Sequence, residues 1–353
     1  MKSNTDAAGL WALAPVSVKP LGGGKVTLLR RDNGAVATLD AQWRPFLGRL
    51  HVFRTMQGHA ASIAGSVPSL RGRELFIRRG LETLIPSGVL VHAAEILDRL
   101  EAGLGPGGHR GPVTLVITTC DRPECLERLL RSLARNREAF GGDWSCEVID
   151  DSRANDSRRR NAELVAAAAS KFPATYFGLE DQEAFIDGIC EQVPAAAEHL
   201  PWLLSGRHPD HADAATYGVP LNLALLRHAG ARIVLVDDDT VVNPWIRPDA
   251  EGGIRFDNHT AMPWVLTDGL EGAARRLKRF GEDPVAAHGA SLGAGVREVL
   301  GSLGKPGGIG ESLAGADYRL VTRLDASTRV RFTQNGLLGD PGTMSDLLVF
   351  MPG

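Results

Sequence analysis

Apolar runs alternate with helical apolar spacing along the middle of this chain. Short apolar runs at residues 113–117, 146–149, 174–178 and 233–236 predict buried strands, and a later run at 330–332 predicts another. Between them, apolar residues three and four positions apart predict helices at 123–136, 157–171 and 221–228. Strands that alternate with helices indicate an α/β fold whose mostly parallel sheet is covered on both faces. Residues 180–215 follow neither pattern, and we interpret them as an insertion near a functional site.

The amino-terminal part of the chain has a different pattern. Residues 25–30 and 35–39 flank Asn33-Gly34, a pair that favours a tight turn, and therefore predict a hairpin. Helical patterns follow at 43–53, 58–64 and 72–84, with a short apolar segment at 88–91. Glycines and prolines at 103–112 then interrupt the pattern. We therefore expect two domains: a small winged-helix-like α+β domain at 1–105 and the α/β domain at 112–353.

Composition narrows the classes of partner and compartment. The 353 residues carry a formal net charge of -3, so we expect no nucleic acid partner. No run approaches the roughly 20 apolar residues of a membrane span, and we expect no transmembrane segment. The 4 cysteines form no CxxC pair, which favours a reducing, cytoplasmic location.

Polar groups follow two of the predicted strands directly. Thr118, Thr119, Asp121 and Arg122 follow the first strand, and the run 237–239 of three aspartates ends the fourth. Adjacent carboxylates repel one another unless a cation lies between them, and a hard divalent ion with oxygen ligands is the usual solution. The pattern predicts a metal-dependent enzyme with a phosphate-bearing substrate.

A further acidic pair, Asp150 and Asp151, ends the second predicted strand. These carboxylates could accept hydrogen bonds from a ligand. They could instead cap the helix expected from residue 157.

Three segments, taken in order, resemble family-two-type glycosyltransferases with the GT-A fold. They are VTLVITTCDRPECLERLLRSL, CEVIDDSRANDS and YGVPLNLALLRHAGARIVLVDDDTVV. The resemblance spans about residues 112–245 and implies a Rossmann-like sheet. It also implies that the donor is a nucleoside diphosphate sugar, preferably a UDP-sugar. Mn²⁺ or Mg²⁺ would then offset the charge of the leaving diphosphate. It assigns base, ribose and phosphate contacts to Thr118, Thr119, Asp121, Arg122, Asp150, Asp151, Asn222, Asp237 and Asp238, and metal contacts to Asp237 and Asp239.

The chain also departs from this family. Gly218 and Asn222 match its pattern ahead of the aspartates, but Leu221 stands where an arginine is expected. One phosphate or base contact is therefore either lost or supplied by Arg227 or Arg232. An inverting enzyme also needs a downstream carboxylate as base. The candidates are Glu311, Asp317, Asp340 and Asp346, of which we single out Asp340, in NGLLGDPG, and Asp317.

The amino-terminal part of the chain resembles the peptide chaperone domain of pyrroloquinoline quinone biosynthesis and related leader-peptide recognition domains. The segments that carry this resemblance are VTLLRRDNGAVATLDAQWRPFLGRL and LETLIPSGVLV. This resemblance implies that an extended peptide adds a strand to the hairpin edge, which would make a ribosomally made peptide the acceptor. A structural cap or a dimerisation domain is the alternative.

Two other functions stay open. VLVDDDTVV also fits haloacid-dehalogenase-type phosphatases, in which Asp237 would be the nucleophile, Asp239 the general acid, and Lys305, Asp340 and Asp346 the later motif residues. A non-catalytic nucleotide- or peptide-binding protein is the other alternative.

Overall fold

The computed structural model describes residues 9–102, 111–205, 218–246, 256, 269–303, 313–325 and 327–333. The chain divides into two compact units, which we call the amino-terminal unit (1–107, 251–266 and 294–353) and the sheet unit (108–250 and 267–293). The junction at 107/108 lies inside the glycine- and proline-rich segment expected to separate the domains. The expected second domain, 112–353, differs from this division, because residues after 293 belong with the amino-terminal unit.

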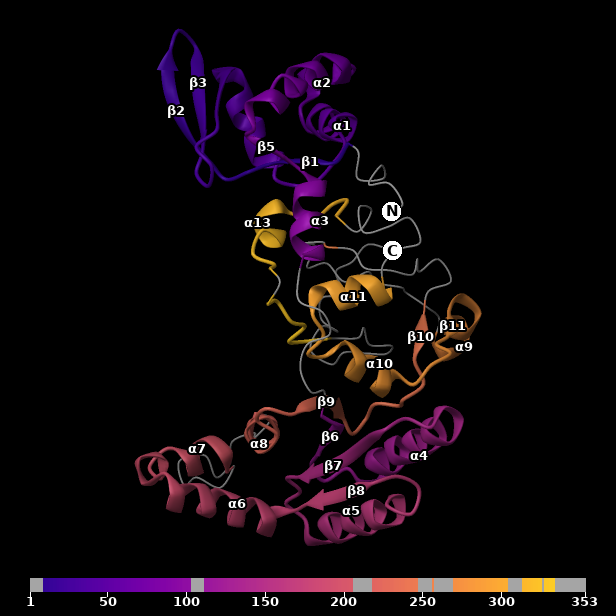
Figure 1. Ribbon diagram of the computed structural model, residues 1–353. Helices are drawn as coiled ribbons and strands as arrows, with labels where there is room; N and C mark the ends of the chain where they lie inside the picture. Colours follow the sequence, from indigo (N-terminus) through magenta and orange to yellow (C-terminus); the bar gives the residue numbers. More distant parts are fainter. Residues whose placement is uncertain are drawn as a thin grey trace. The chain divides into compact units, whose positions relative to one another are not determined.

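The amino-terminal unit contains the expected hairpin (Figure 1). Strands β2 (Val16–Gly22), β3 (Lys25–Arg30) and β4 (Val36–Asp40) form an antiparallel sheet in that order, and β1 (Trp11–Leu13) pairs with β5 (Leu90–His92). In the turn between β3 and β4, Gly34 has a positive φ of 73°, whereas Asn33 accepts a hydrogen bond from the Ala35 N–H at 3.0 Å through its side chain. Residues 31–35 connect the two strands, and of the Asn33-Gly34 pair only Gly34 adopts the left-handed region.

Helices cover this sheet and complete a first core. They are η1 (Ala41–Arg49), α1 (Met56–Ser66), η2 (Pro68–Leu70), α2 (Glu74–Glu82), η3 (Ile85–Ser87) and α3 (Ala93–Glu101). The three expected helical segments are present, although η1 is a 3₁₀ helix that contains Pro45, which has no N–H to donate. α1 begins where the Thr55 hydroxyl accepts a hydrogen bond from the Gly58 N–H at 3.0 Å.

A second core in this unit joins segments far apart in the sequence. Phe53, Ile96 and Leu100 pack with Leu300 of α11 (Val296–Leu303) and with Tyr318 of α13 (Tyr318–Val321). All five side chains are buried. Shared apolar burial is the physical reason why the residues after 293 belong to the amino-terminal unit rather than to the α/β unit.

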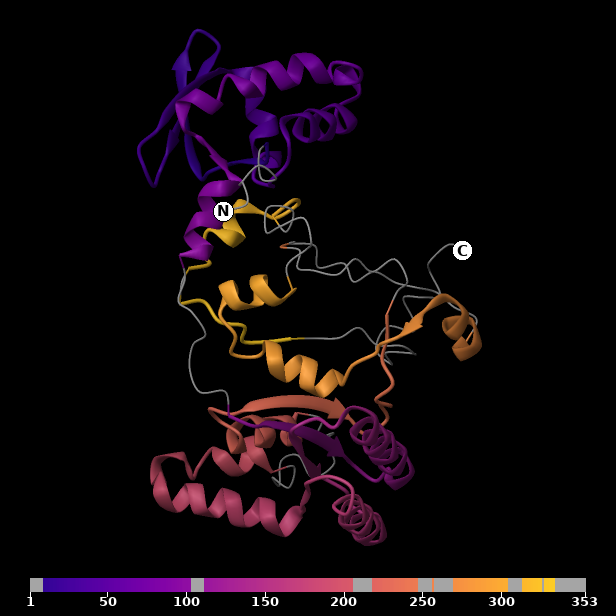
Figure 2. The same cartoon turned by 45° about the vertical axis from the view of Figure 1, so that its right-hand side comes forward.

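The sheet unit is α/β, as the alternating pattern predicted (Figure 2). Strands β6 (Val113–Thr119), β7 (Trp144–Asp150), β8 (Ala174–Phe177) and β9 (Arg232–Asp237) are all parallel, in the order β8-β7-β6-β9. The strand expected at 330–332 is absent from the described residues there; Arg329 makes only an isolated bridge to Gly295.

Helices of the sheet unit pack on both faces of the sheet. α4 (Pro123–Phe140), α5 (Asn155–Ala168) and α10 (Pro284–Ser291) share a core with Val113, Leu115 and Ile117 of β6, whereas α6 (Leu179–Gln192), α7 (Leu200–Leu204) and α8 (Val219–Arg227) pack with Val116. The short elements η4 (Pro194–Ala196), β10 (Trp245–Ile246), α9 (Gly269–Arg276) and β11 (Lys278–Arg279) complete it. Of the segment 180–215, expected to be irregular, residues 180–204 are mostly helical, and residues 206–215 lie outside the described residues.

α10 is fastened to the sheet unit by one buried carboxylate. Asp283 accepts hydrogen bonds from Asn136 Nδ2 at 2.9 Å, from Trp144 Nε1 at 2.7 Å and from the Val285 N–H at 2.9 Å. The residue therefore caps α10 and ties it to α4 and β7. Within the described ranges, no helix combines the length and apolar character needed to cross a membrane.

Candidate functional site at the carboxyl ends of β6 and β9

The strand order marks one edge of the sheet as a place for ligands. From β6 the chain adds β7 and then β8 on one side, and β9 returns to the other side of β6. Parallel sheets bind ligands outside the carboxyl ends of the strands, at the point where the order reverses. That point lies between β6 and β9, where Thr118 is paired with Asp237.

A buried hydrogen bond joins the two strand ends at this point. Thr119 Oγ1 donates to Asp238 Oδ2 at 2.7 Å, and the Asp238 side chain is 0% exposed. Burial raises the pKa of Asp238, although the Thr119 hydrogen bond and the charge of Arg122 act in the opposite direction. Asp238 therefore lies beneath the surface and holds the strands together, whereas its neighbours Asp237 and Asp239 are exposed.

Arg122 supplies positive charge to the aspartate run. Its Nη2 lies 3.0 Å from Asp238 Oδ1, and its Nη1 donates to Asp239 Oδ2 at 3.0 Å. Asp238 Oδ1 makes no hydrogen bond, so the first contact is an ion pair without hydrogen-bond geometry. A divalent ion was expected as the cation for the aspartate run 237–239. Arg122 already pairs with two of these three carboxylates, Asp238 and Asp239.

Asp121 shapes the loop between β6 and α4. It has a φ of 53°, the only positive value at a non-glycine among the described residues. Its carboxylate accepts hydrogen bonds from the N–H groups of Arg153 at 3.2 Å and Ala154 at 3.0 Å. Partial burial would raise the pKa of Asp121, but these backbone donors outweigh it and the pKa lies below its usual value. The residue is exposed, and its carboxylate holds the loop after β7 in place.

Asp150 is placed differently from the ligand-binding position expected of it. It is 0% exposed, and it accepts hydrogen bonds from the Ser152 N–H at 2.8 Å, Asn161 Nδ2 at 2.9 Å and Tyr176 Oη at 2.8 Å. Burial and the hydrogen bond to Asp150 raise the pKa of Tyr176. The carboxylate thus joins the end of β7 to Asn161 within α5, and it does not match the alternative capping interpretation, because the N-cap position of α5 is Ala154, without a side-chain cap. Asp151 is half-buried beside it, and its N–H donates to the Thr119 carbonyl at 2.9 Å.

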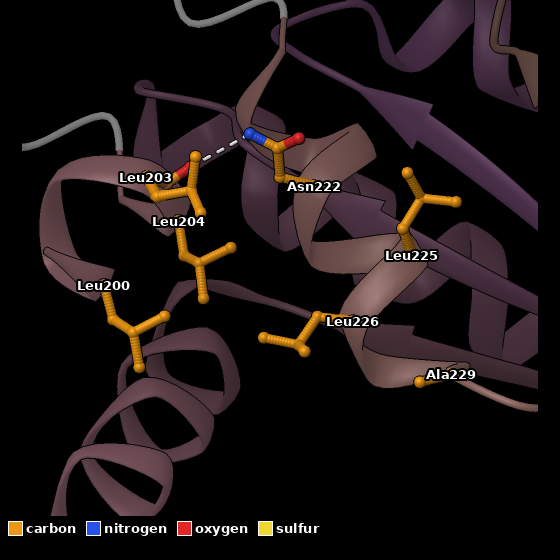
Figure 3. A pocket seen from close by; sticks show the side chains of 7 residues that line it. All are labelled: Leu200, Leu203, Leu204, Asn222, Leu225, Leu226 and Ala229. Atoms are coloured by element: carbon orange, nitrogen blue, oxygen red, sulfur yellow. Dashed lines mark hydrogen bonds between the residues drawn. The ribbon is translucent and has the colours of Figure 1, made fainter. Parts of the chain in front are cut away.

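Asn222 lies in the first turn of α8, in an apolar groove between α7 and α8. Figure 3 shows its Nδ2 reaching Leu203, whose carbonyl accepts the hydrogen bond at 3.2 Å. The groove has a volume of about 360 Å³, and its other lining residues are Leu200, Leu204, Leu225, Leu226 and Ala229. The Asn222 side chain therefore joins two helices, and the nucleotide contact expected of it stays a prediction.

Neither arginine proposed to replace the one missing at Leu221 reaches the strand ends. Arg227 Nε donates to both oxygens of Glu147, at 3.0 and 2.9 Å, in the middle of β7. Arg232 lies at the amino end of β9, opposite Val113, and donates to the carbonyls of Gly111 and Gly289. Both serve the packing of the sheet unit, which leaves the other alternative, loss of that contact.

Asp317 does not have the properties of a catalytic base. It is 4% exposed and caps α13 by accepting a hydrogen bond from the Arg319 N–H at 2.8 Å. Its hydrogen bonds with the Arg319 side chain, more than its burial, set the pKa of Asp317 below the usual value, which weakens it as a proton acceptor. Asp340, Glu311, Asp346 and Lys305 lie outside the described residues.

The exposed aspartates are suited to share a divalent ion with a phosphate. In the described part of the chain, no group of three or more His, Cys, Asp or Glu side chains is arranged to hold a metal by itself. Mg²⁺, however, is commonly bound by one or two carboxylates together with substrate phosphates and water. Asp237 and Asp239 are two such carboxylates, so the residues fit an ion that arrives with its substrate.

Sequence reasoning missed the supporting polar network, including Glu147, Ser152, Asn161 and Asp283. Glu147 is 5% exposed and also lies 2.8 Å from His228 Nε2. Glu147 is a charged residue inside an apolar strand run, and this is the one sequence signal that pointed to the network, because a buried charge needs a partner.

Searches with this chain against protein-family models, curated proteins and solved structures found no match.

Proposed function

We propose that the sheet unit is a glycosyltransferase that moves a sugar from a nucleoside diphosphate sugar, most simply a UDP-sugar, to an acceptor. The observation that carries this proposal is a junction at the reversal point of a parallel sheet: Thr119, the last residue of β6, and Arg122, at the start of α4, contact Asp238 and Asp239, which directly follow β9. An arginine fork and exposed carboxylates at that edge match what a metal-bound diphosphate requires.

The chain's own residues divide the work in this proposal. Thr118, Asp121 and Asp151, at the ends of β6 and β7, form the side on which the base and ribose bind. Arg122 rotates its guanidinium from Asp239 to the diphosphate, and Asp237 and Asp239 hold Mn²⁺ or Mg²⁺, which offsets the charge of the leaving group. Thr119, Asp238 and Asp150 fix the positions of the strand ends. Asp340 remains the candidate base, and a peptide bound by the amino-terminal unit remains the candidate acceptor.

Release of nucleoside diphosphate from UDP-sugars and GDP-sugars tests this proposal. The purified chain should release UDP in the presence of Mn²⁺, and Asp239→Ala should abolish the release. Asp156→Ala is the matched control, because Asp156 is an exposed aspartate of the same unit, with an ion pair to Arg159 at 2.9 Å. Mg²⁺-dependent hydrolysis of a generic phosphate ester, without nucleotide release, would support the phosphatase alternative instead.

A further inference from the structure

The first turn of α2 directs large apolar side chains away from the core. Leu75 and Phe76 are 55% and 60% exposed, whereas Ile77 and Leu81 of the same helix are 1% and 2% exposed. Removing exposed apolar side chains of this size from water favours association with a partner. More than half of each side chain is therefore left uncovered by the fold and is available to a partner.

Leu75 and Phe76 border a hollow, and Phe76 is held in place by its packing on Trp43. Gly72, Arg73, Leu75, Phe76 and Arg79 line a depression of about 440 Å³. The Phe76 ring stacks on Trp43, with centroids 6.5 Å apart and an angle of 22° between the planes. Trp43 in turn fits against Gly80, where a Cβ atom would lie 2.5 Å from Trp43 Cζ2. A rigid aromatic side chain beside a hollow is a common anchor point for a partner.

The charge around the hollow is positive. Arg71, Arg73 and Arg79 are exposed, and none has an ion pair with an acidic side chain among the described residues. Arg78, by contrast, pairs with Glu82 at 3.1 Å, and Glu74 accepts a hydrogen bond from the Gly72 N–H at 3.3 Å. Three unpaired guanidinium groups on a chain of net charge -3 form a local basic surface.

We propose that this surface, formed by Arg71, Arg73, Leu75, Phe76 and Arg79, binds an acidic peptide segment that carries an aliphatic or aromatic side chain next to its carboxylates. The apolar side chain occupies the hollow between Leu75 and Phe76. The carboxylates pair with the arginines, whose planar forks match them. A single hollow with guanidinium groups at its rim fits one inserted side chain, whereas a lipid surface is met by a broad, flat apolar face.

This inference deepens the peptide-acceptor part of the proposed function and places recognition on α2 rather than on the hairpin edge. It requires only binding. Its failure can therefore be distinguished from failure of sugar transfer, which the nucleotide-release assay measures separately.

The proposed peptide-binding surface on α2 is tested by selecting peptides from a random displayed library for binding to the full-length chain. The enriched peptides should combine Asp or Glu with Leu, Phe or Trp. The best of them should bind about tenfold more weakly or worse to the double variant Arg73→Glu, Arg79→Glu and to Phe76→Ser. All three residues are exposed, so the fold should survive, and a thermal melt checks this.

The matched control is the double variant Arg31→Glu, Arg49→Glu, which makes the same charge change at exposed positions of the same unit and should bind like the parent chain. Enrichment of neutral or basic peptides, or equal binding by the α2 variants, would overturn the proposal. Sedimentation with phosphatidylglycerol vesicles that is lost in Arg73→Glu, Arg79→Glu, with no acidic peptide enriched, would assign the surface to lipid and would also overturn it.

Discussion

Replacing Arg122 with glutamine should destabilise the sheet unit at neutral pH. Arg122 is 51% exposed, but its partner Asp238 is 0% exposed, and the two approach to 3.0 Å. A fully exposed pair contributes about 1 kcal/mol or less, and removing one partner of a buried pair costs about 3–5 kcal/mol. A half-exposed arginine over a buried carboxylate lies between these limits, so we expect a loss of about 2 kcal/mol in the free energy of unfolding.

The loss should depend on pH in a defined direction. Burial already raises the pKa of Asp238, and Arg122 is one of the groups that limit the rise. Without Arg122 the pKa rises further. A carboxyl group whose pKa is higher in the folded state stabilises the fold while it is protonated, and this contribution is lost as the pH rises through the folded pKa. The variant should therefore match the parent chain at about pH 4 and differ most at about pH 7.

Hydrogen exchange of the β6 and β7 amides measures the opening free energy of this unit rather than of the whole chain. Arg160→Gln is the matched control: Arg160 is also 51% exposed but pairs with Glu127, which is 28% exposed, at 3.6 Å. The control should lose less than about 0.5 kcal/mol at either pH. An equal loss at both pH values in Arg122→Gln, or no loss at neutral pH, would refute the reasoning.

Other predictions concern the residues that position the sheet. Asp150→Asn should cost about 2–3 kcal/mol in urea unfolding, because one amide group cannot accept from Ser152, Asn161 and Tyr176 at once; an unchanged midpoint would contradict the assigned role. Glu147→Ala should lower the thermal midpoint by an amount equivalent to about 2–3 kcal/mol, since Arg227 and His228 lose their shared partner, and Arg159→Ala, at an exposed pair, should change it little. Gly289→Ala should destabilise the sheet unit by about 1 kcal/mol in urea, because a Cβ there would lie 2.4 Å from Val113 Cγ2 and the strain exceeds the gain in helix propensity. Gly188→Ala on α6, where a Cβ meets open space, should instead stabilise the chain, and the reverse order of the two would count against this packing.

The sequence was informative about the α/β pattern because buried strands need long apolar runs. β6, β7 and β9 each carry such a run, and all were predicted within two residues at each end. β6 and β7 are mostly buried as expected, whereas no residue of β9 is buried. The helix α4 was also predictable, because its apolar residues recur at helical spacing. Long-range packing was not visible: nothing local in residues 294–325 indicates that they complete a core with α3.

At the site, sequence reasoning located the strand ends but not the direction of each side chain. Asp150 and Asp238 follow apolar runs as Asp237 and Asp239 do, yet both are fully buried. Their partners Asn161 and Thr119 come from elsewhere in the chain, at separations that no local motif encodes. Which polar group faces a ligand and which supports the site is decided by tertiary packing.

Calorimetric titration of the intact chain with UDP and with GDP, each with and without Mn²⁺, tests most directly whether the β6–β9 edge binds a nucleoside diphosphate. Micromolar binding of UDP that requires Mn²⁺, and that is lost in Asp239→Ala but kept in Asp156→Ala, is the predicted result. Absence of binding by either nucleotide, or binding that is indifferent to Mn²⁺ and to Asp239→Ala, would contradict the account.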